Sequence, residues 1–135
     1  MIELSNPNAQ TLSENQSVIF TSTLLHTGCA ECHRTNSASV NLIRKSAIYE
    51  ISFNCNIGAT AADTDAEISV VVDGSPLLET TSIVPTAAGG DLQNVSAATY
   101  VQTCCLPNVI VTLTNTGTAP INVGANPRLT IRRVA

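Results

Sequence analysis

In the stretch Ala47-Ile-Tyr-Glu-Ile-Ser-Phe-Asn-Cys-Asn-Ile-Gly58, apolar and polar side chains alternate. The apolar set is Tyr49, Ile51, Phe53, Cys55 and Ile57. Successive side chains of a β-strand point to opposite faces of its sheet, so the pattern predicts a long strand with one face in the core. We interpret Cys55 as a small buried hydrophobic residue, because a free cysteine inside a core packs as one.

A second stretch, residues 67–73, is apolar at most positions and ends in Asp73-Gly74. Such a composition is expected for a strand covered on both faces. Asp-Gly is a strong signal for a two-residue hairpin turn, in which the backbone needs positive φ angles. We therefore predict a hairpin in which residues 76–84 return as the partner strand.

Further strands are predicted on both sides of this hairpin. They cover residues 17–25, 39–43, 93–103, 108–115 and 127–135, and Pro107 and Thr116-Gly117 mark breaks between them. About eight to ten short strands with no helical period predict an all-β domain, a two-sheet antiparallel jelly-roll sandwich that spans residues 1–135. Residues 1–8 precede the first predicted strand, and we expect them to form an N-terminal arm.

The composition narrows the choice of partners. The net charge is −4, only 12% of residues are charged, and the chain has six basic residues. Nucleic acid is not an expected partner, because binding it needs a clustered basic face. A freely diffusing protein usually carries more surface charge. The low content of charged residues therefore favours assembly, which removes part of the weakly charged surface from water.

The sequence gives no signal for a membrane or for secretion. No apolar run reaches the length of a membrane span. The first residues, Met-Ile-Glu-Leu-Ser-Asn-Pro-Asn, have no basic segment followed by an apolar one, so no signal peptide is predicted. We expect a protein made in the cytoplasm that reaches a virion, or a cell or spore surface, by lysis or by assembly.

The segment His26-Thr-Gly-Cys29-Ala-Glu-Cys32-His33 carries thiols and imidazoles, which are the ligands that zinc prefers. A closed site needs more ligands than one turn offers, and Cys104-Cys105 are the obvious second pair. Candidate ligands of a structural zinc ion are therefore Cys29, Cys32, His26, His33, Cys104 and Cys105. Apart from this candidate structural zinc, we expect no cofactor.

Three other interpretations of these cysteines stay open. Cys29-Ala-Glu-Cys32-His33 matches the C-x-x-C-H pattern of covalent haem attachment, although attachment follows export. A disulfide between Cys29 and Cys32, or between either of them and Cys104 or Cys105, is geometrically easier than one between the adjacent Cys104 and Cys105, which would be strained. Reduced thiols without a role are the interpretation that the sequence favours most.

No catalytic motif accompanies these residues. The sequence has no glycine-rich phosphate loop and no G-x-S-x-G nucleophile turn. We therefore expect no enzymatic activity. The alternative is a metal-binding or redox protein that uses the Cys29 and Cys32 loop.

Four segments together resemble the globular heads of complement and tumour-necrosis-factor-like jelly rolls. They are Ile48-Tyr-Glu-Ile-Ser-Phe53, Ile68-Ser-Val-Val-Val-Asp-Gly-Ser-Pro76, Val109-Ile-Val-Thr-Leu-Thr-Asn115 and Leu129-Thr-Ile-Arg-Arg-Val-Ala135. The sequence is most similar to bacterial and phage versions, such as the heads of collagen-like exosporium glycoproteins. Ala47 departs from the usual glycine at the start of the first segment.

The resemblance implies a tight homotrimer without catalysis. No Gly-X-Y collagen stalk precedes the jelly roll, which favours a phage or prophage particle component, such as a fibre tip or decoration protein. The alternative is a spore- or cell-surface head, and other particle or surface proteins are possible partners. Tyr49, Phe53 and Tyr100 are the aromatic candidates for the trimer interface.

Overall fold

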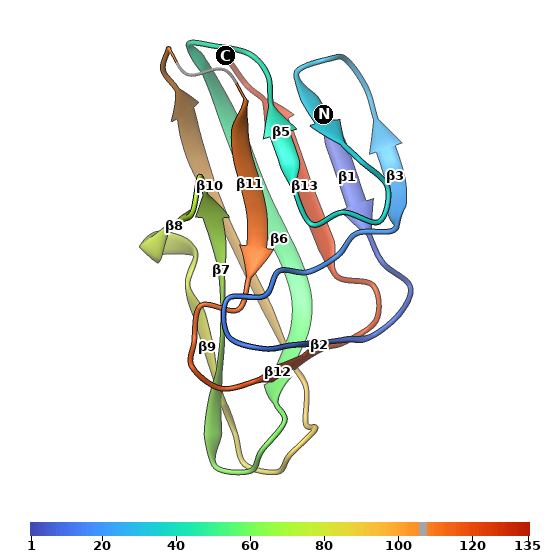
Figure 1. Cartoon of the computed structure of the whole chain (residues 1–135), viewed down its shortest axis with the longest axis vertical. Helices are drawn as coiled ribbons and strands as arrows, with labels where there is room; N and C mark the ends of the chain where they lie inside the picture. The colour runs from blue at the N-terminus through green and yellow to red at the C-terminus, as the bar shows by residue number, and fades with distance from the viewer. Residues whose placement is uncertain (106–107) are drawn as a thin grey trace.

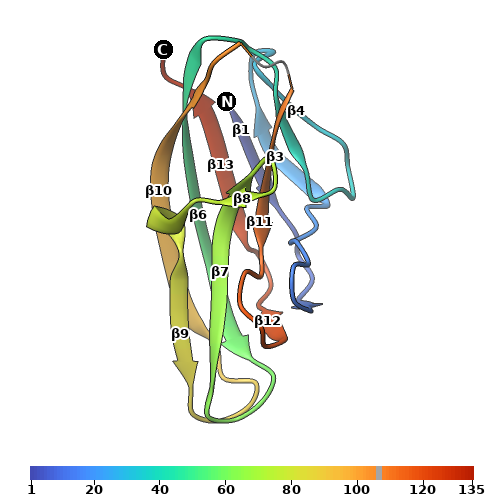
Figure 2. The ribbon, with the colours of Figure 1, turned by 60° about the vertical axis from the view of Figure 1, so that its left-hand side comes forward.

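The computed structural model describes residues 1–105 and 108–135, so the predicted break at Pro107 lies outside the described residues. Two antiparallel sheets pack face to face (Figures 1 and 2). The first, sheet A, contains β1 (Ile2–Ser5), β2 (Gln10–Leu12), β3 (Ser22–His26), β6 (Ala47–Ala59), β10 (Gln93–Thr103), β12 (Ile121–Val123) and β13 (Arg128–Arg133). The second, sheet B, contains β4 (Glu31–His33), β5 (Val40–Leu42), β7 (Thr64–Val72), β8 (Ser75–Pro76), β9 (Ser82–Thr86) and β11 (Val109–Thr114). The predicted all-β jelly-roll sandwich is confirmed.

Strand β6 organises sheet A. One of its edges pairs with β10 from Ala47↔Thr103 to Ile57↔Gln93. Its other edge is shared, because β13 pairs with residues 49–54 and β12 pairs with residues 57–59. Beyond β13 lie β1 and then β3, so β10 and β3 are the two outer strands of that part of the sheet.

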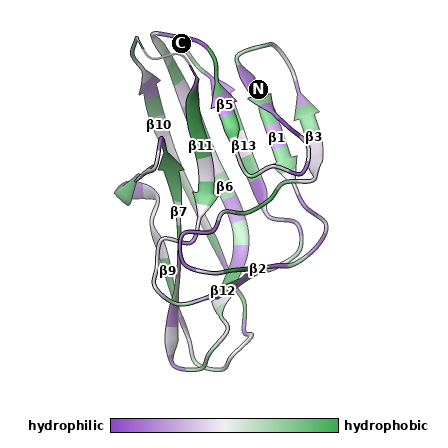
Figure 3. Cartoon of the chain, in the orientation of Figure 1, coloured by the Kyte–Doolittle hydropathy of each residue, from purple (hydrophilic) through white to green (hydrophobic). Residues whose placement is uncertain are grey.

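The core lies between the sheets and follows the alternation that the sequence shows. Tyr49, Ile51, Phe53, Cys55 and Ile57 all point inward from β6 and are buried. Facing residues of sheet B, such as Ile68, Val70, Val111 and Leu113, are buried as well. Figure 3 shows apolar residues along β7 and β11, and both apolar and polar residues along β6.

The predicted Asp73-Gly74 turn is present, and its φ angles of 49° and 84° have the signs that a type I′ turn requires. The predicted return strand over residues 76–84 is interrupted. After β8 the chain forms a short 3-10 helix, η1 (Leu78–Thr80), before β9 begins. The side-chain hydroxyl of Thr80 accepts a hydrogen bond from Val70 N at 2.9 Å and so takes the place of a strand partner.

Two predictions at the N-terminal end were wrong. Residues 2–5 are not an arm: they form β1, which lies between β13 and β3 and buries Ile2 and Leu4. The predicted strand 17–25 begins only at Ser22. Before it, the side chain of Gln10 accepts from Ile19 N at 2.8 Å and donates to Ile19 O at 3.0 Å, in place of a neighbouring strand.

Candidate functional site

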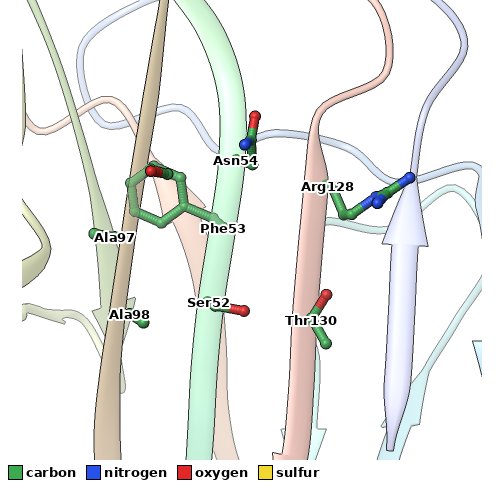
Figure 4. A pocket seen from close by; sticks show the side chains of 8 residues that line it. Ser52, Phe53, Asn54, Ala97, Ala98, Arg128 and Thr130 are labelled. Carbon is green, nitrogen blue, oxygen red and sulfur yellow. The ribbon is translucent and has the colours of Figure 1, made fainter.

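The outward-facing side of sheet A has a central area of small, uncharged side chains across β6, β10 and β13. We call this area the neutral face and define it as Ser52, Asn54, Ser96, Ala98 and Thr130. Together with Phe53, Ala97 and Arg128, these residues line a shallow depression of about 310 Å³. In Figure 4, Ser52, Ala98 and Thr130 point to one side of the sheet, while Phe53 and Ala97 point to the core side.

Side-chain amide hydrogen bonds lie at one end of the neutral face. Asn94 Nδ2 donates to Asn54 Oδ1 at 2.8 Å and to Asn56 Oδ1 at 3.0 Å. These amides join β10 to β6 on the outside of the sheet, beside the backbone ladder. None of the five side chains of the neutral face titrates near neutral pH, so the area is suited to contact rather than to proton transfer.

The charged residues around the neutral face are paired. Arg128 Nε lies 3.0 Å from Glu3 Oε1, and Arg132 Nη2 lies 2.9 Å from Glu50 Oε2. The hydrogen bond from Arg132 lowers the pKa of Glu50, and the same bond raises the pKa of Arg132. Exposed pairs of this kind contribute little to stability, but they leave the surroundings of the neutral face nearly neutral.

Large apolar side chains are exposed on η1, β9 and β10, and Ile83 of β9 lies beside Asp65 and Glu67 of sheet B. Leu78 of η1 is 80% exposed, Ile83 of β9 is 57% exposed and Tyr100 of β10 is 66% exposed. We call Leu78 and Ile83 the apolar edge. A hydrogen bond of 3.0 Å from Thr99 Oγ1 to Glu79 Oε1 fixes η1 beside β10.

The three predicted interface aromatics separate into two kinds. Tyr49 has no exposed surface and Phe53 is 3% exposed, so both are core residues of the protomer and do not offer a surface to a second copy. Tyr49 Oη donates to Ala30 O at 2.8 Å and accepts from Arg44 N at 3.2 Å, and burial raises its pKa. Tyr100 alone lies on the surface, at the end of the neutral face near Glu50.

The predicted zinc ligands are not brought together. Within residues 1–105 and 108–135, no three His, Cys, Asp or Glu side chains are placed where they could hold one metal ion. The two imidazoles contact backbone carbonyls: His26 Nε2 lies 3.1 Å from Glu31 O, and His33 Nε2 lies 2.9 Å from Ser37 O. Cys104 and Cys105 are exposed after β10. The zinc site stays a prediction.

Cys55 differs from the other four thiols. It is buried on the core face of β6, whereas Cys29, Cys32, Cys104 and Cys105 are exposed. Burial removes the thiolate from water and raises the pKa of Cys55 to about 12. The thiolate is the nucleophile in thiol chemistry. Cys55 is therefore protected from thiol reagents both by its raised pKa and by the atoms that cover it.

We therefore expect a thiol reagent such as Ellman's reagent, added to the reduced native protein at pH 8, to titrate four thiols promptly. The fifth thiol should react only after denaturant opens the core. Peptide mapping after blocking of the native protein should find Cys55 unmodified. Prompt reaction of all five thiols in the native protein would contradict the burial of Cys55.

No family model matches this sequence, and no curated protein matches it. Its fold does match solved structures. Murine APRIL at pH 5.0 aligns with a TM-score of 0.62 at 13% identity, over 91% of this chain and 96% of that one. The globular domain of zebrafish complement 1qA protein gives a TM-score of 0.60 at 11% identity, over 98% of both chains.

A third match comes from a virus particle. PRD1 vertex protein P5 aligns with a TM-score of 0.55 at 16% identity, over 99% of this chain and 96% of that one. At identities this low, the structural alignments establish the fold alone. It is the tumour-necrosis-factor-like jelly roll that the sequence resembles. In the described residues, no helix is both long and apolar enough to cross a membrane.

Proposed function

We propose that the protein is a non-enzymatic, trimeric module with a structural or binding role in a phage particle, such as a fibre tip or a decoration protein. The observation that carries the proposal is that one protomer combines a neutral face with an exposed apolar edge. The resemblance to complement and tumour-necrosis-factor-like heads supports the trimer. The likeness to PRD1 vertex protein P5 supports the particle.

The apolar edge gives the driving force for assembly. Full burial of a leucine or isoleucine side chain contributes roughly 1.5–3 kcal/mol. Leu78 and Ile83 leave most of this contribution unused in the protomer, since both are largely exposed. Seating them on a second copy would recover it.

The neutral face is a suitable receptor for the apolar edge of another copy. Its small side chains leave room for leucine and isoleucine, and the ionised group that lines the same depression, Arg128, is paired with Glu3 at 3.0 Å. Covering the small side chains themselves desolvates no charge. Charged residues are depleted at interface centres for this reason. Because face and edge are different patches, their contact is heterologous, and a heterologous contact closes into a ring when its rotation allows. The trimer is the ring that the resemblance implies.

A photo-crosslink tests whether the edge of one copy lies on the face of the next. A photoactivatable phenylalanine analogue replaces Leu78, the most exposed residue of the edge. Irradiation should give a covalent two-chain product, and its crosslinked peptides should come from β6, β10 or β13. The same analogue at Ile110, which is exposed on sheet B, is the control. Two-chain products from the analogue at Ile110 but not from the analogue at Leu78 would contradict the proposed contact between apolar edge and neutral face.

The particle role needs a separate test. Antibodies against the purified protein would be applied to lysates and to intact cells or spores of the natural host and viewed by immunogold electron microscopy. Label on phage-like particles is the outcome that we predict. Label confined to the cell or spore surface would contradict the phage-particle role and support a surface head instead, whatever the crosslink shows.

A further inference from the structure

Strand β4 lies at the end of the molecule where β10 finishes and where both termini are found (Figure 2), and it carries Cys32. The thiols of Cys29 and Cys32 are both exposed. Cys29 belongs to the connection between β3 and β4, and Cys32 is the middle residue of β4. The pair is therefore reachable by a small molecule without any opening of the core.

Cys29 is in contact with a cation. Arg44 Nη2 donates to Cys29 Sγ at 2.9 Å. The backbone of Arg44 is held on both sides, because its N–H donates to Tyr49 Oη at 3.2 Å and its carbonyl accepts from Thr103 Oγ1 at 2.6 Å. The guanidinium therefore extends from an anchored backbone.

The cysteine side of this contact is anchored as well. The carbonyl of Ala30, next to Cys29, accepts from Ile43 N at 2.9 Å and from Tyr49 Oη at 2.8 Å. Tyr49 thus connects the Cys29 loop to the Arg44 loop through a single buried hydroxyl. The arrangement holds sulfur and guanidinium together before any reaction takes place.

We propose that Cys29 and Cys32 are a redox-active dithiol that reacts with low-molecular-weight disulfides, with Cys29 as the attacking thiol. The thiolate is the nucleophile in thiol–disulfide exchange, and an adjacent arginine stabilises its negative charge. Among the four exposed thiols, Cys29 is the one with a hydrogen bond from a guanidinium of the described residues. Cys32, three residues along the chain, is the resolving thiol.

With glutathione disulfide as the oxidant, the exchange has two steps. The Cys29 thiolate attacks one sulfur of glutathione disulfide, the S–S bond breaks, and one glutathione leaves as a thiolate that takes up a proton. The Cys32 thiolate then attacks the Cys29 sulfur, expels the second glutathione and closes the Cys29–Cys32 disulfide. Two protein thiols are oxidised, one disulfide is reduced, and the two thiol protons end on the two glutathione molecules.

The test uses the full, reduced chain in oxygen-free buffer with glutathione disulfide, quenched with acid and mapped by peptide mass spectrometry. The wild type should form the Cys29–Cys32 disulfide before other oxidised products. In Cys32→Ser the glutathione adduct should accumulate on Cys29. In Cys29→Ser, reaction at Cys32 should be slow.

Arg44→Ala should slow the reaction at Cys29 by about threefold to tenfold, because it removes the guanidinium that donates to Cys29 Sγ and holds a positive charge beside the attacking sulfur. Arg44→Lys, which keeps the charge, should restore part of the rate. Lys45→Ala is the matched control, since it removes the same charge from the same exposed loop. Near-ultraviolet circular dichroism checks that each variant keeps the native packing.

Two outcomes would overturn the proposal. One is equal reaction rates at Cys29, Cys104 and Cys105 in the wild type. The other is an equal rate of reaction at Cys29 in the Arg44→Ala and Lys45→Ala variants, provided that both keep the native packing. Both outcomes leave the trimer untouched, so they are distinguishable from failure of the proposed function.

Discussion

Replacing Ala98 by arginine is expected to turn the proposed trimer into a folded monomer. Ala98 points outward from the middle of β10 at the centre of the neutral face, and its side chain is exposed in the protomer. In the monomer the new guanidinium reaches water, so the fold should tolerate it. In the trimer it would lie against Leu78 and Ile83 of the next copy, where an unpaired charge costs several kcal/mol.

Sedimentation velocity at micromolar concentration measures this effect. The Ala98→Arg protein should sediment as a single 14.1 kDa species with the circular dichroism spectrum of the wild type. Ile110→Arg is the matched control, because Ile110 is an exposed strand residue on the outer side of sheet B. A trimer that survives Ala98→Arg would place the interface elsewhere.

The largest effect on stability is expected for Gly58→Ala. Gly58 lies in β6 where the chain approaches Asp91 just before β10, and an added Cβ would sit 1.7 Å from Asp91 O and 2.9 Å from Asp91 C. Both are backbone atoms, so no side-chain rotation relieves the clash. Moving the 87–92 connection away from β6 should cost about 3 kcal/mol, at the upper end of overpacking effects.

Urea unfolding at a fixed protomer concentration measures this loss, since dissociation of a trimer is coupled to unfolding. Gly124→Ala is the control from the same neighbourhood. Its Cβ would meet Leu92 Cδ1, the end of a flexible side chain, at 3.1 Å and Asn56 Cβ at 3.3 Å, and neither distance is as short as the backbone contacts at Gly58. Its effect should stay below about 1 kcal/mol. Equal losses for the two variants would contradict the close approach at Gly58.

Long strands were predictable because alternation over many residues averages out local exceptions. β6 and β10 were predicted nearly to their ends, and the type I′ turn after β7 was predicted from Asp73-Gly74. β2, β4 and β12 have three residues each and offer no period to detect. Side chains of Gln10 and Thr80 replace strand partners, and sequence patterns do not distinguish such bonds from solvated polar groups.

The candidate site was less predictable than the fold. Tyr49 and Phe53 have the size and apolarity of interface residues, yet the alternation that predicts β6 also places them with Ile51 in the core. Tyr100 lies on the outward-facing side of β10 and is exposed. The sequence did not indicate Ser96 and Ala98 as site residues, because the role of a small residue becomes clear only when its neighbours on adjacent strands are known. The Arg44 contact with Cys29 joins two loops, which no spacing in the sequence indicates.

The molar mass of the unmodified protein in solution, measured by light scattering on a sizing column with and without chelator and reductant, tests the proposed assembly most directly. We predict three times 14.1 kDa at micromolar concentration in every condition, because the contacts proposed between copies need neither metal nor disulfide. A stable monomer would contradict the trimer and the role of the neutral face.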